Sequence, residues 1–328
     1  MKRMMLFVSA LSCFFILSPN VACAGKVLLV HSYHAGYLWT DDITRGVRKG
    51  LEGVGAELEI FYMDSRRNLS EAWKIQAGNL ARKRVAETRP DVVITADENA
   101  QAYFGKAYVG QAYPQIVFCG VNAQPSEYGY PASNVTGITE RPFFAQCFDM
   151  LKVIVPGVKN VAVIGDASAT CNHIIAFLKT KTLPIRVASI DKPETFAQWQ
   201  DSIRNYQKTV DAICIILYHT LLKEPGGVEV MPPKEVMSWT IANNTKPLFS
   251  VAPFCVEDGA IFGIVNSAFE QGFEAARIAR EILKGRKAGE FPLLKPRKGA
   301  VWLNIRTAEN MGFEITFDII RATDKIIE

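Results

Sequence analysis

KVLLVHSYHAGYLWTDD, residues 26–42, contains in order the signals of a strand, a polar loop and a helix. Val27–Val30 is an unbroken apolar run, which is typical of a parallel strand that helices cover on both faces. Thr40 occupies an N-cap position ahead of Asp41 and Asp42, so a helix is expected to begin there with acids in its first turn. Strand, loop and helix in this order form the repeating unit of α/β folds.

The polar loop after the strand, His31–His34, carries four hydrogen-bonding side chains. Open α/β sheets bind ligands at the carboxyl ends of their strands, so this loop is a candidate binding segment. Tyr37 and Trp39 follow it and would add flat aromatic surfaces. The alternative is that both rings pack on the surface of the lobe and that the histidines are hydrogen-bonded loop residues.

The start of the chain has the pattern of an export signal. Lys2 and Arg3 precede an apolar stretch, and Ala22–Ala24 supplies the small residues of a cleavage site. The mature protein is therefore expected to be periplasmic or secreted, with cleavage near Ala24. Cys23 opens a second route, attachment of a lipid anchor, although Asn20 lies where that motif has an aliphatic residue.

Composition is that of a globular protein, with 49% hydrophobic and 21% charged residues in a chain of 328. The length exceeds that of a usual single domain of roughly 100–200 residues, which favours two lobes. A net charge of +4 gives no electrostatic footprint for nucleic acid, so no such partner is expected. The cysteines beyond the signal have no zinc-binding spacing, and whether any of them pair stays open: Cys119, Cys147, Cys171, Cys214 and Cys255.

Strand and helix patterns alternate along the rest of the chain. Further strands are expected at 57–62, 91–95, 115–119, 160–165, 184–190, 211–217, 247–251, 259–265 and 299–303. Helical patterns separate them, and the chain is expected to close with a helix that runs to Glu328. Such alternation predicts α/β architecture with two doubly wound parallel-sheet lobes joined by a hinge.

The predicted divisions of the chain are a signal peptide (1–24), a first lobe (25–137 plus 259–294) and a second lobe (138–258 plus 295–328). Connecting segments are expected near 135–139, 255–258 and 294–298. In this arrangement the carboxyl ends of the strands in both lobes line one cleft.

Three segments, in this order, resemble a known family: SYHAGYLWTDDITRG at 32–46, NVTGIT at 134–139 and WLNIRTAENMGFEITFDIIRATDKIIE at 302–328. They are similar to the tryptophan/phenylalanine-type substrate-binding proteins of ABC transporters, which have the type I periplasmic-binding fold. The resemblance implies a monomer that binds a small molecule and works with an ABC permease and its ATPase. Two departures prevent the ligand from being carried over. The family commonly has Gly-Thr-Pro-Ala where Ala96–Asn99 stands here, and often Asp-Pro where Gly120–Ala123 stands.

The predicted ligand-binding residues are Ser32, Tyr33, His34, Trp39, Asp97, Glu98 and Asn122 on one wall of the cleft, and Asp166, Ser168, Tyr218, Phe254 and Glu257 on the other. Asp97 or Glu98 would pair with an ammonium group, and the helix that follows Ser168 would offer backbone N–H groups to an anion. The alternative for these acids is helix capping.

The sequence therefore predicts an exported solute-binding protein of an ABC importer, which captures an amino acid or a small polar ring compound by closure of two lobes. A periplasmic protein that presents a small molecule to a separate signalling receptor is the alternative, because the opening segment also resembles the ligand-sensing halves of some histidine kinases. No nucleophile elbow, phosphate loop or HExxH pattern occurs, so no catalytic residue, metal or cofactor is expected and a secreted enzyme is disfavoured.

Overall fold

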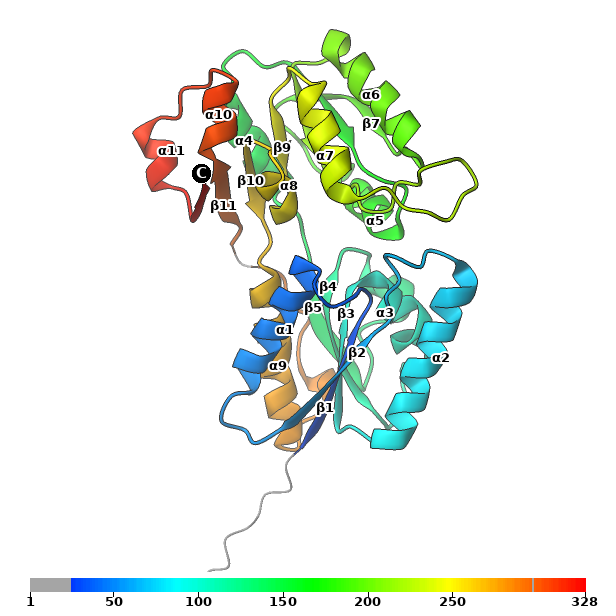
Figure 1. Ribbon diagram of the computed structural model, residues 1–328. Helices are drawn as coiled ribbons and strands as arrows, with labels where there is room; N and C mark the ends of the chain where they lie inside the picture. Colours follow the sequence, from blue (N-terminus) through cyan, green and yellow to red (C-terminus); the bar gives the residue numbers. More distant parts are fainter. Residues whose placement is uncertain (1–24, 297) are drawn as a thin grey trace, which may run out of the picture.

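The computed structural model describes residues 25–296 and 298–328, which form two α/β lobes stacked one above the other (Figure 1). The predicted signal peptide and the lipid anchor at Cys23 fall on residues 1–24 and lie outside the described residues. Within the described part, no helix combines the length and apolar character that a membrane crossing requires.

The first lobe is built on a five-stranded parallel sheet with the order β2-β1-β3-β4-β5. Its strands are β1 (Lys26–His31), β2 (Glu57–Tyr62), β3 (Val92–Ala96), β4 (Gln115–Val121) and β5 (Val135–Thr139). Its helices are α1 (Leu38–Leu51), α2 (Glu71–Thr88), α3 (Asp97–Tyr103) and α9 (Ala268–Leu283), with short 3₁₀ turns η1 (Gly105–Tyr108), η2 (Pro125–Tyr128) and η3 (Ala288–Glu290).

Helices cover both faces of this sheet, as the apolar run in β1 predicts. Val27 and Leu29 pack on the side of α1 and α9, whereas Leu28 and Val30 point to the opposite side, toward α2 and α3. All four side chains are buried. Successive residues of a strand face opposite sides, so a strand with both sides covered must be apolar throughout.

The second lobe contains a seven-stranded sheet with the order β12-β11-β10-β9-β8-β6-β7, in which only β10 and β11 run antiparallel to each other among the described pairs. Its strands are β6 (Asn160–Ile164), β7 (Arg186–Asp191), β8 (Ala212–Ile215), β9 (Leu248–Ser250), β10 (Phe262–Val265), β11 (Ala300–Asn304) and β12 (Lys325–Ile327). Its helices are α4 (Phe144–Ile154), α5 (Ala169–Leu178), α6 (Phe196–Thr209), α7 (Pro233–Ala242), α8 (Pro253–Glu257), α10 (Ile305–Asn310) and α11 (Phe317–Arg321).

The predicted boundaries between the lobes differ from the structure at two places. The predicted second lobe begins at residue 138, inside β5, although the whole of β5 belongs to the first sheet. Phe262 and Gly263 of β10 pair with β9, so this strand belongs to the second sheet and not to the first lobe. The chain returns to the first lobe only between Val265 and Ala268, past the predicted segment at 255–258. An apolar run of this kind suits either sheet, and only the position of β9 decides which sheet it joins.

Two predicted helix boundaries also differ from the structure. The first helix begins at Leu38, before Thr40, because the Asp41 carboxylate accepts a hydrogen bond from the Gly36 amide and closes the turn earlier. The closing helix ends at Arg321, and the chain finishes in β12, which pairs with β11. Asp324 fixes this strand through its carboxylate, which accepts from the Val301 amide at 2.8 Å.

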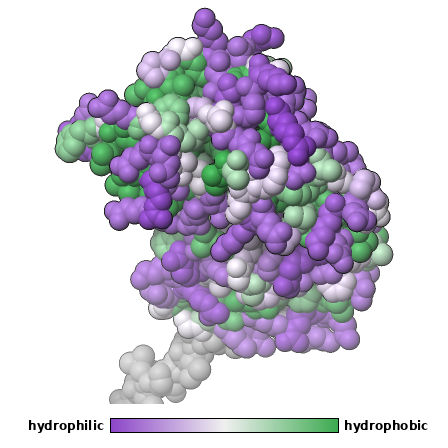
Figure 2. All heavy atoms as spheres, turned by 45° about the horizontal axis from the view of Figure 1, so that its top comes forward, coloured by the Kyte–Doolittle hydropathy of each residue, from purple (hydrophilic) through white to green (hydrophobic). Residues whose placement is uncertain are grey.

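The five cysteines among the described residues are all buried and free, which resolves the pairing that the sequence leaves open. The face in Figure 2 is mainly hydrophilic, and apolar residues lie on it in small groups. Large apolar side chains therefore lie mostly in the cores on the two faces of each sheet.

Candidate functional site

A cleft of about 750 Å³ lies between the lobes. The first lobe contributes the loops that follow β1 and β2, and the second contributes residues 228–234 together with α8. Two smaller hollows, of about 250 Å³ and 40 Å³, adjoin it. Arg66 lines all three, so this side chain lies at the centre of the space between the lobes.

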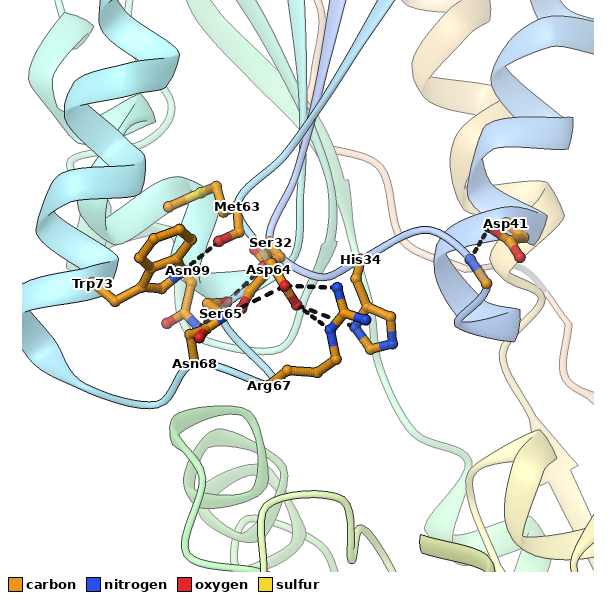
Figure 3. Close-up of polar contacts among 11 residues, drawn as sticks. Ser32, His34, Asp41, Met63, Asp64, Ser65, Arg67, Asn68, Trp73 and Asn99 are labelled. Atoms are coloured by element: carbon orange, nitrogen blue, oxygen red, sulfur yellow. Dashed lines mark hydrogen bonds and ion pairs between the residues drawn. The ribbon is translucent and has the colours of Figure 1, made fainter. Parts of the chain in front are cut away.

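The loop after β2 holds Arg66 in place through the residues on either side of it. Ser65 donates from its hydroxyl to the backbone oxygen of Ser32 at 2.6 Å, which ties the loop to β1. Arg67 forms two hydrogen bonds with the Asp64 carboxylate, at 2.8 and 2.7 Å (Figure 3). The backbone at position 66 is therefore anchored before any ligand arrives.

The Arg66 side chain is only 6% exposed. Its guanidinium carbon lies 4.4 Å from the centre of the Tyr33 ring and 4.7 Å from that of Tyr37, within the range of cation–π contacts. The Nε and Nη1 atoms are buried and have no hydrogen-bond partner among the described residues. Arginine stays protonated in proteins, so the cleft contains a buried positive charge with unused donors.

A threonine of the second lobe bridges the cleft. Thr170, in the first turn of α5, donates from Oγ1 to Glu98 Oε2 at 3.0 Å, and its Oγ1 lies 3.1 Å from Tyr33 Oη. Glu98 also accepts from the Asn122 amide at 2.6 Å. Because Tyr33 and Glu98 belong to the first lobe, these hydrogen bonds form only when the lobes are close together.

Carboxyl groups gather below this bridge. Trp39 Nε1 donates to Asp97 Oδ1 at 2.8 Å, while Asp97 Oδ2 is buried without a partner among the described residues. Burial, and then the charges of Glu98 and Glu140, raise the pKa of Asp97 well above its usual range. Burial, followed by Glu98, raises the pKa of Glu140 to about 8. Asp97 also has a left-handed backbone, with φ 66°, a conformation that is uncommon for residues other than glycine, although Asp adopts it more readily than most.

Aromatic rings from both lobes also line the cleft. Tyr37 of the first lobe lies 5.4 Å from the His219 ring and 6.4 Å from the Phe254 ring, both of the second lobe. Burial lowers the pKa of His219 well below its usual range, so this ring is neutral at pH 7. The three rings give the cleft an uncharged, flat-sided wall.

Residues 39–327 match the family model described as ABC transporter substrate binding protein. The chain belongs to this family. Its membership confirms the predicted resemblance and solute-binding role, and it implies a small-molecule ligand and a permease partner. The family is a substrate-binding class and is usually periplasmic.

Solved structures are similar to this family member over almost its whole length. A conserved domain protein from Vibrio cholerae is 20% identical, covers 92% of this chain and 99% of its own, and has a TM-score of 0.71. An ABC domain from Streptococcus pneumoniae in complex with L-Trp is 16% identical, covers 93% and 100%, and has a TM-score of 0.69. A ligand-free, open substrate binding protein with adhesive properties from Clostridium difficile is 15% identical, covers 93% and 99%, and has a TM-score of 0.63.

These neighbours confirm the predicted type I periplasmic-binding fold of two α/β lobes. No curated protein sequence matches the chain.

The predicted site residues of this substrate-binding protein fall into two groups. Seven line the hollows between the lobes: Tyr33, His34, Trp39, Asp97, Ser168, Phe254 and Glu257. The others do not line these three hollows: Ser32, Glu98, Asn122, Asp166 and Tyr218. Which of the twelve contact a ligand stays a prediction.

Residues of the second group form hydrogen bonds within the protein. Ser32 donates to the Ala96 oxygen at 2.6 Å and accepts from the Ala100 amide, so its hydroxyl holds the start of α3. Tyr218 donates to Asp258 at 2.5 Å. Asp166 Oδ1 accepts from the amide of Ser168, the N-cap residue of α5, at 3.2 Å, which fits the helix-capping alternative, and its Oδ2 accepts from the Thr220 amide at 3.0 Å.

Two members of the first group have mixed surroundings. Trp39 is only 7% exposed, and it packs in the core with residues of α9 as well as lining a hollow. His34 lies 3.6 Å from Asp64 at the cleft edge, and burial, followed by the charge of Arg67, lowers its pKa.

Sequence reasoning missed Arg66, Thr170 and Glu140 as cleft residues. No spacing or motif marks Arg66, because it stands beside Arg67 in a polar loop that looks like a solvated turn. No group of His, Cys, Asp and Glu side chains within 25–296 and 298–328 could hold a metal ion.

Proposed function

We propose that this protein is exported and, as a monomer, captures an amino acid or a small polar ring compound for an ABC importer. The closed form then delivers the compound to a membrane permease driven by its ATPase. The observation that carries the proposal is the cleft of about 750 Å³ lined by both lobes. This volume lies within the usual range of small-molecule sites, roughly 300–1,000 Å³.

The lining of the cleft supports a compound with a flat part. Tyr37, His219 and Phe254 lie against one another from both lobes, at ring separations of 4.4–6.4 Å. Aromatic walls favour rings through offset or edge contacts. The similar structure from Streptococcus pneumoniae is a complex with L-Trp, which agrees with this choice of compound class.

The proposed mechanism is closure by population shift. A compound that touches both lobes binds the closed form better than the open form, so it favours closure by that difference in affinity. The bridge from Thr170 to Tyr33 and Glu98 adds contacts that exist only in the closed form. The permease would recognise the closed surface, and no chemical change of the compound is needed.

A thermal-shift screen of amino acids, purines, sugars and small organic acids tests the proposal. A compound at about 100 times its Kd should stabilise the protein by about 2.7 kcal/mol. We expect an amino acid or a ring compound to raise the melting temperature, and mass spectrometry should recover that compound unchanged. A response to sugars alone would contradict the compound class, and turnover of the compound would contradict a binding role.

Uptake of the labelled compound by cells separates import from sensing. Deletion of the gene should abolish uptake if the protein serves an importer. Unchanged uptake, with a lost transcriptional response to the compound, would favour the sensing role.

A further inference from the structure

We infer that the compound bound in this cleft carries a negatively charged oxyanion, a carboxylate in the compound classes above, and that Arg66 binds it. The inference rests on the proposed function and names the charge of its ligand. Arg66 is the only residue that lines all three of the hollows described above, so a ligand anywhere between the lobes lies near it.

The missing partner of Arg66 is the first argument. A buried charge is costly unless it is paired and hydrogen-bonded. Arg141 shows how this chain satisfies a less buried arginine: its guanidinium donates to four backbone oxygens, at 2.7–3.3 Å. Arg66 is more deeply buried, yet it forms no ion pair among the described residues and leaves Nε and Nη1 unused. A ligand oxyanion would supply the missing negative charge and the hydrogen-bond acceptors for these two atoms.

The geometry around Arg66 suits an anion in particular. The rings of Tyr33 and Tyr37 contact the guanidinium through cation–π interactions, which need none of its N–H groups. The unused donors Nε and Nη1 therefore stay available for charge-assisted hydrogen bonds to ligand oxygens. Ser65 and Arg67 anchor the backbone on both sides, so little ordering is needed on binding.

A second positive element faces Arg66 across the hollow of about 250 Å³. Ser168, Ala169 and Thr170 line that hollow at the amino end of α5, where the helix dipole is positive. The Cys171 amide donates to Ser168 Oγ and the Ser168 amide donates to Asp166, so the amides of Ala169 and Thr170 are the ones left for an anion. Lys74 also lines it. The opposing charges are the exposed Glu194 in the lining and the buried Asp166, whose carboxylate accepts hydrogen bonds from Ser168. An anion between Arg66 and α5 would contact both lobes and so favour closure.

The test compares matched pairs of compounds on the wild-type protein, at equal ionic strength: L-phenylalanine with L-phenylalaninamide, L-tryptophan with L-tryptophanamide, and benzoate with benzamide. We expect a rise in melting temperature for at least one carboxylate and none for its amide. Arg66→Gln should weaken binding of that carboxylate by at least about 30-fold in calorimetric titration, since a buried charged hydrogen bond is lost.

Arg45→Gln is the matched control, because Arg45 also lies over an aromatic ring but is exposed and outside the cleft. It removes the same charge and should keep the wild-type affinity. Arg66→Lys keeps the charge but not the planar fork, so it should bind more weakly than wild type even if Arg66→Gln does not fold. An amide that binds as well as its acid, unchanged affinity in Arg66→Gln, or hits that are all neutral or cationic would overturn the inference. Neutral or cationic hits leave the proposed function intact. If no compound in the wider screen binds, the proposed function itself is contradicted.

Discussion

At the scale of single residues, the carboxyl of Glu140 determines a pH dependence of stability. Its pKa is about 8 in the folded protein and about 4.5 in the unfolded chain. The folded protein thus holds this proton more tightly, so the free energy of unfolding falls as pH rises from about 4.5 to about 8, with no contribution to the slope outside that window. Glu140→Gln should remove this contribution, so that between the two ends of the window the variant loses roughly 1–4 kcal/mol less free energy of unfolding than the wild type does.

Urea denaturation of the ligand-free protein near pH 5 and near pH 8 measures this difference. Asn122 donates to Glu140 at 2.8 Å, and an amide oxygen at position 140 can accept the same bond. Glu87→Gln, at an exposed position on α2, is the control and should follow the wild-type slope. Equal slopes for wild type and Glu140→Gln would contradict the prediction.

At the scale of elements, two glycines determine how α1 and α9 pack side by side in the first lobe (Figure 1). A Cβ atom at Gly272 would collide with the backbone oxygen of Ile43, and one at Gly46 with the backbone oxygen of Phe269. Gly272→Ala should lower the free energy of unfolding by about 1–3 kcal/mol, because forced separation of the helices outweighs the ~1 kcal/mol that alanine gains in helix propensity.

Thermal and urea unfolding measure this cost. Arg277→Ala, at an exposed position on the same helix, should change stability by no more than about 0.5 kcal/mol. A Gly272→Ala protein as stable as wild type would mean that the helices separate without loss. The packing matters for the site, because α1 begins directly after Tyr37, one of the two rings that hold Arg66.

At the scale of the whole molecule, the Thr170 bridge couples ligand binding to closure. In an open form Tyr33, Glu98 and Thr170 would each be hydrated, so removing the Thr170 hydroxyl penalises the closed form alone. Thr170→Val should therefore weaken ligand affinity by roughly 5- to 50-fold. Without ligand, the variant and the wild type, both in the open form, should have similar melting temperatures. The change also leaves Glu98 Oε2 without its closed-form donor.

Calorimetric titration gives the affinity, and small-angle scattering with and without ligand reports the degree of closure. Thr180→Val is the control, since Thr180 is exposed and its hydroxyl donates only to the Phe177 oxygen among the described residues. Wild-type affinity and closure in Thr170→Val would show that the bridge does not contribute to closure.

Local patterns in the sequence were sufficient for most of the architecture. The apolar run Val27–Val30 predicts a strand covered on both faces, and Ser70 predicts the start of α2, where it accepts from the Trp73 amide. Such signals are readable because a strand period or a helix cap depends on neighbours along the chain. Where an element pairs depends on distant segments. Local patterns therefore place β10 in the wrong lobe and predict a helix where β12 lies.

The candidate site shows the same limit more sharply. The sequence by itself determined that polar and aromatic residues follow β1 and that strand ends from two lobes meet in a cleft. It does not separate Arg66 from Arg67, two identical neighbours in one loop. Only the tertiary structure decides that Arg67 is exposed and paired with Asp64, whereas Arg66 turns inward between Tyr33 and Tyr37 with donors unused. Burial and pairing are properties of the surroundings in space, and those surroundings come from segments that the sequence places elsewhere.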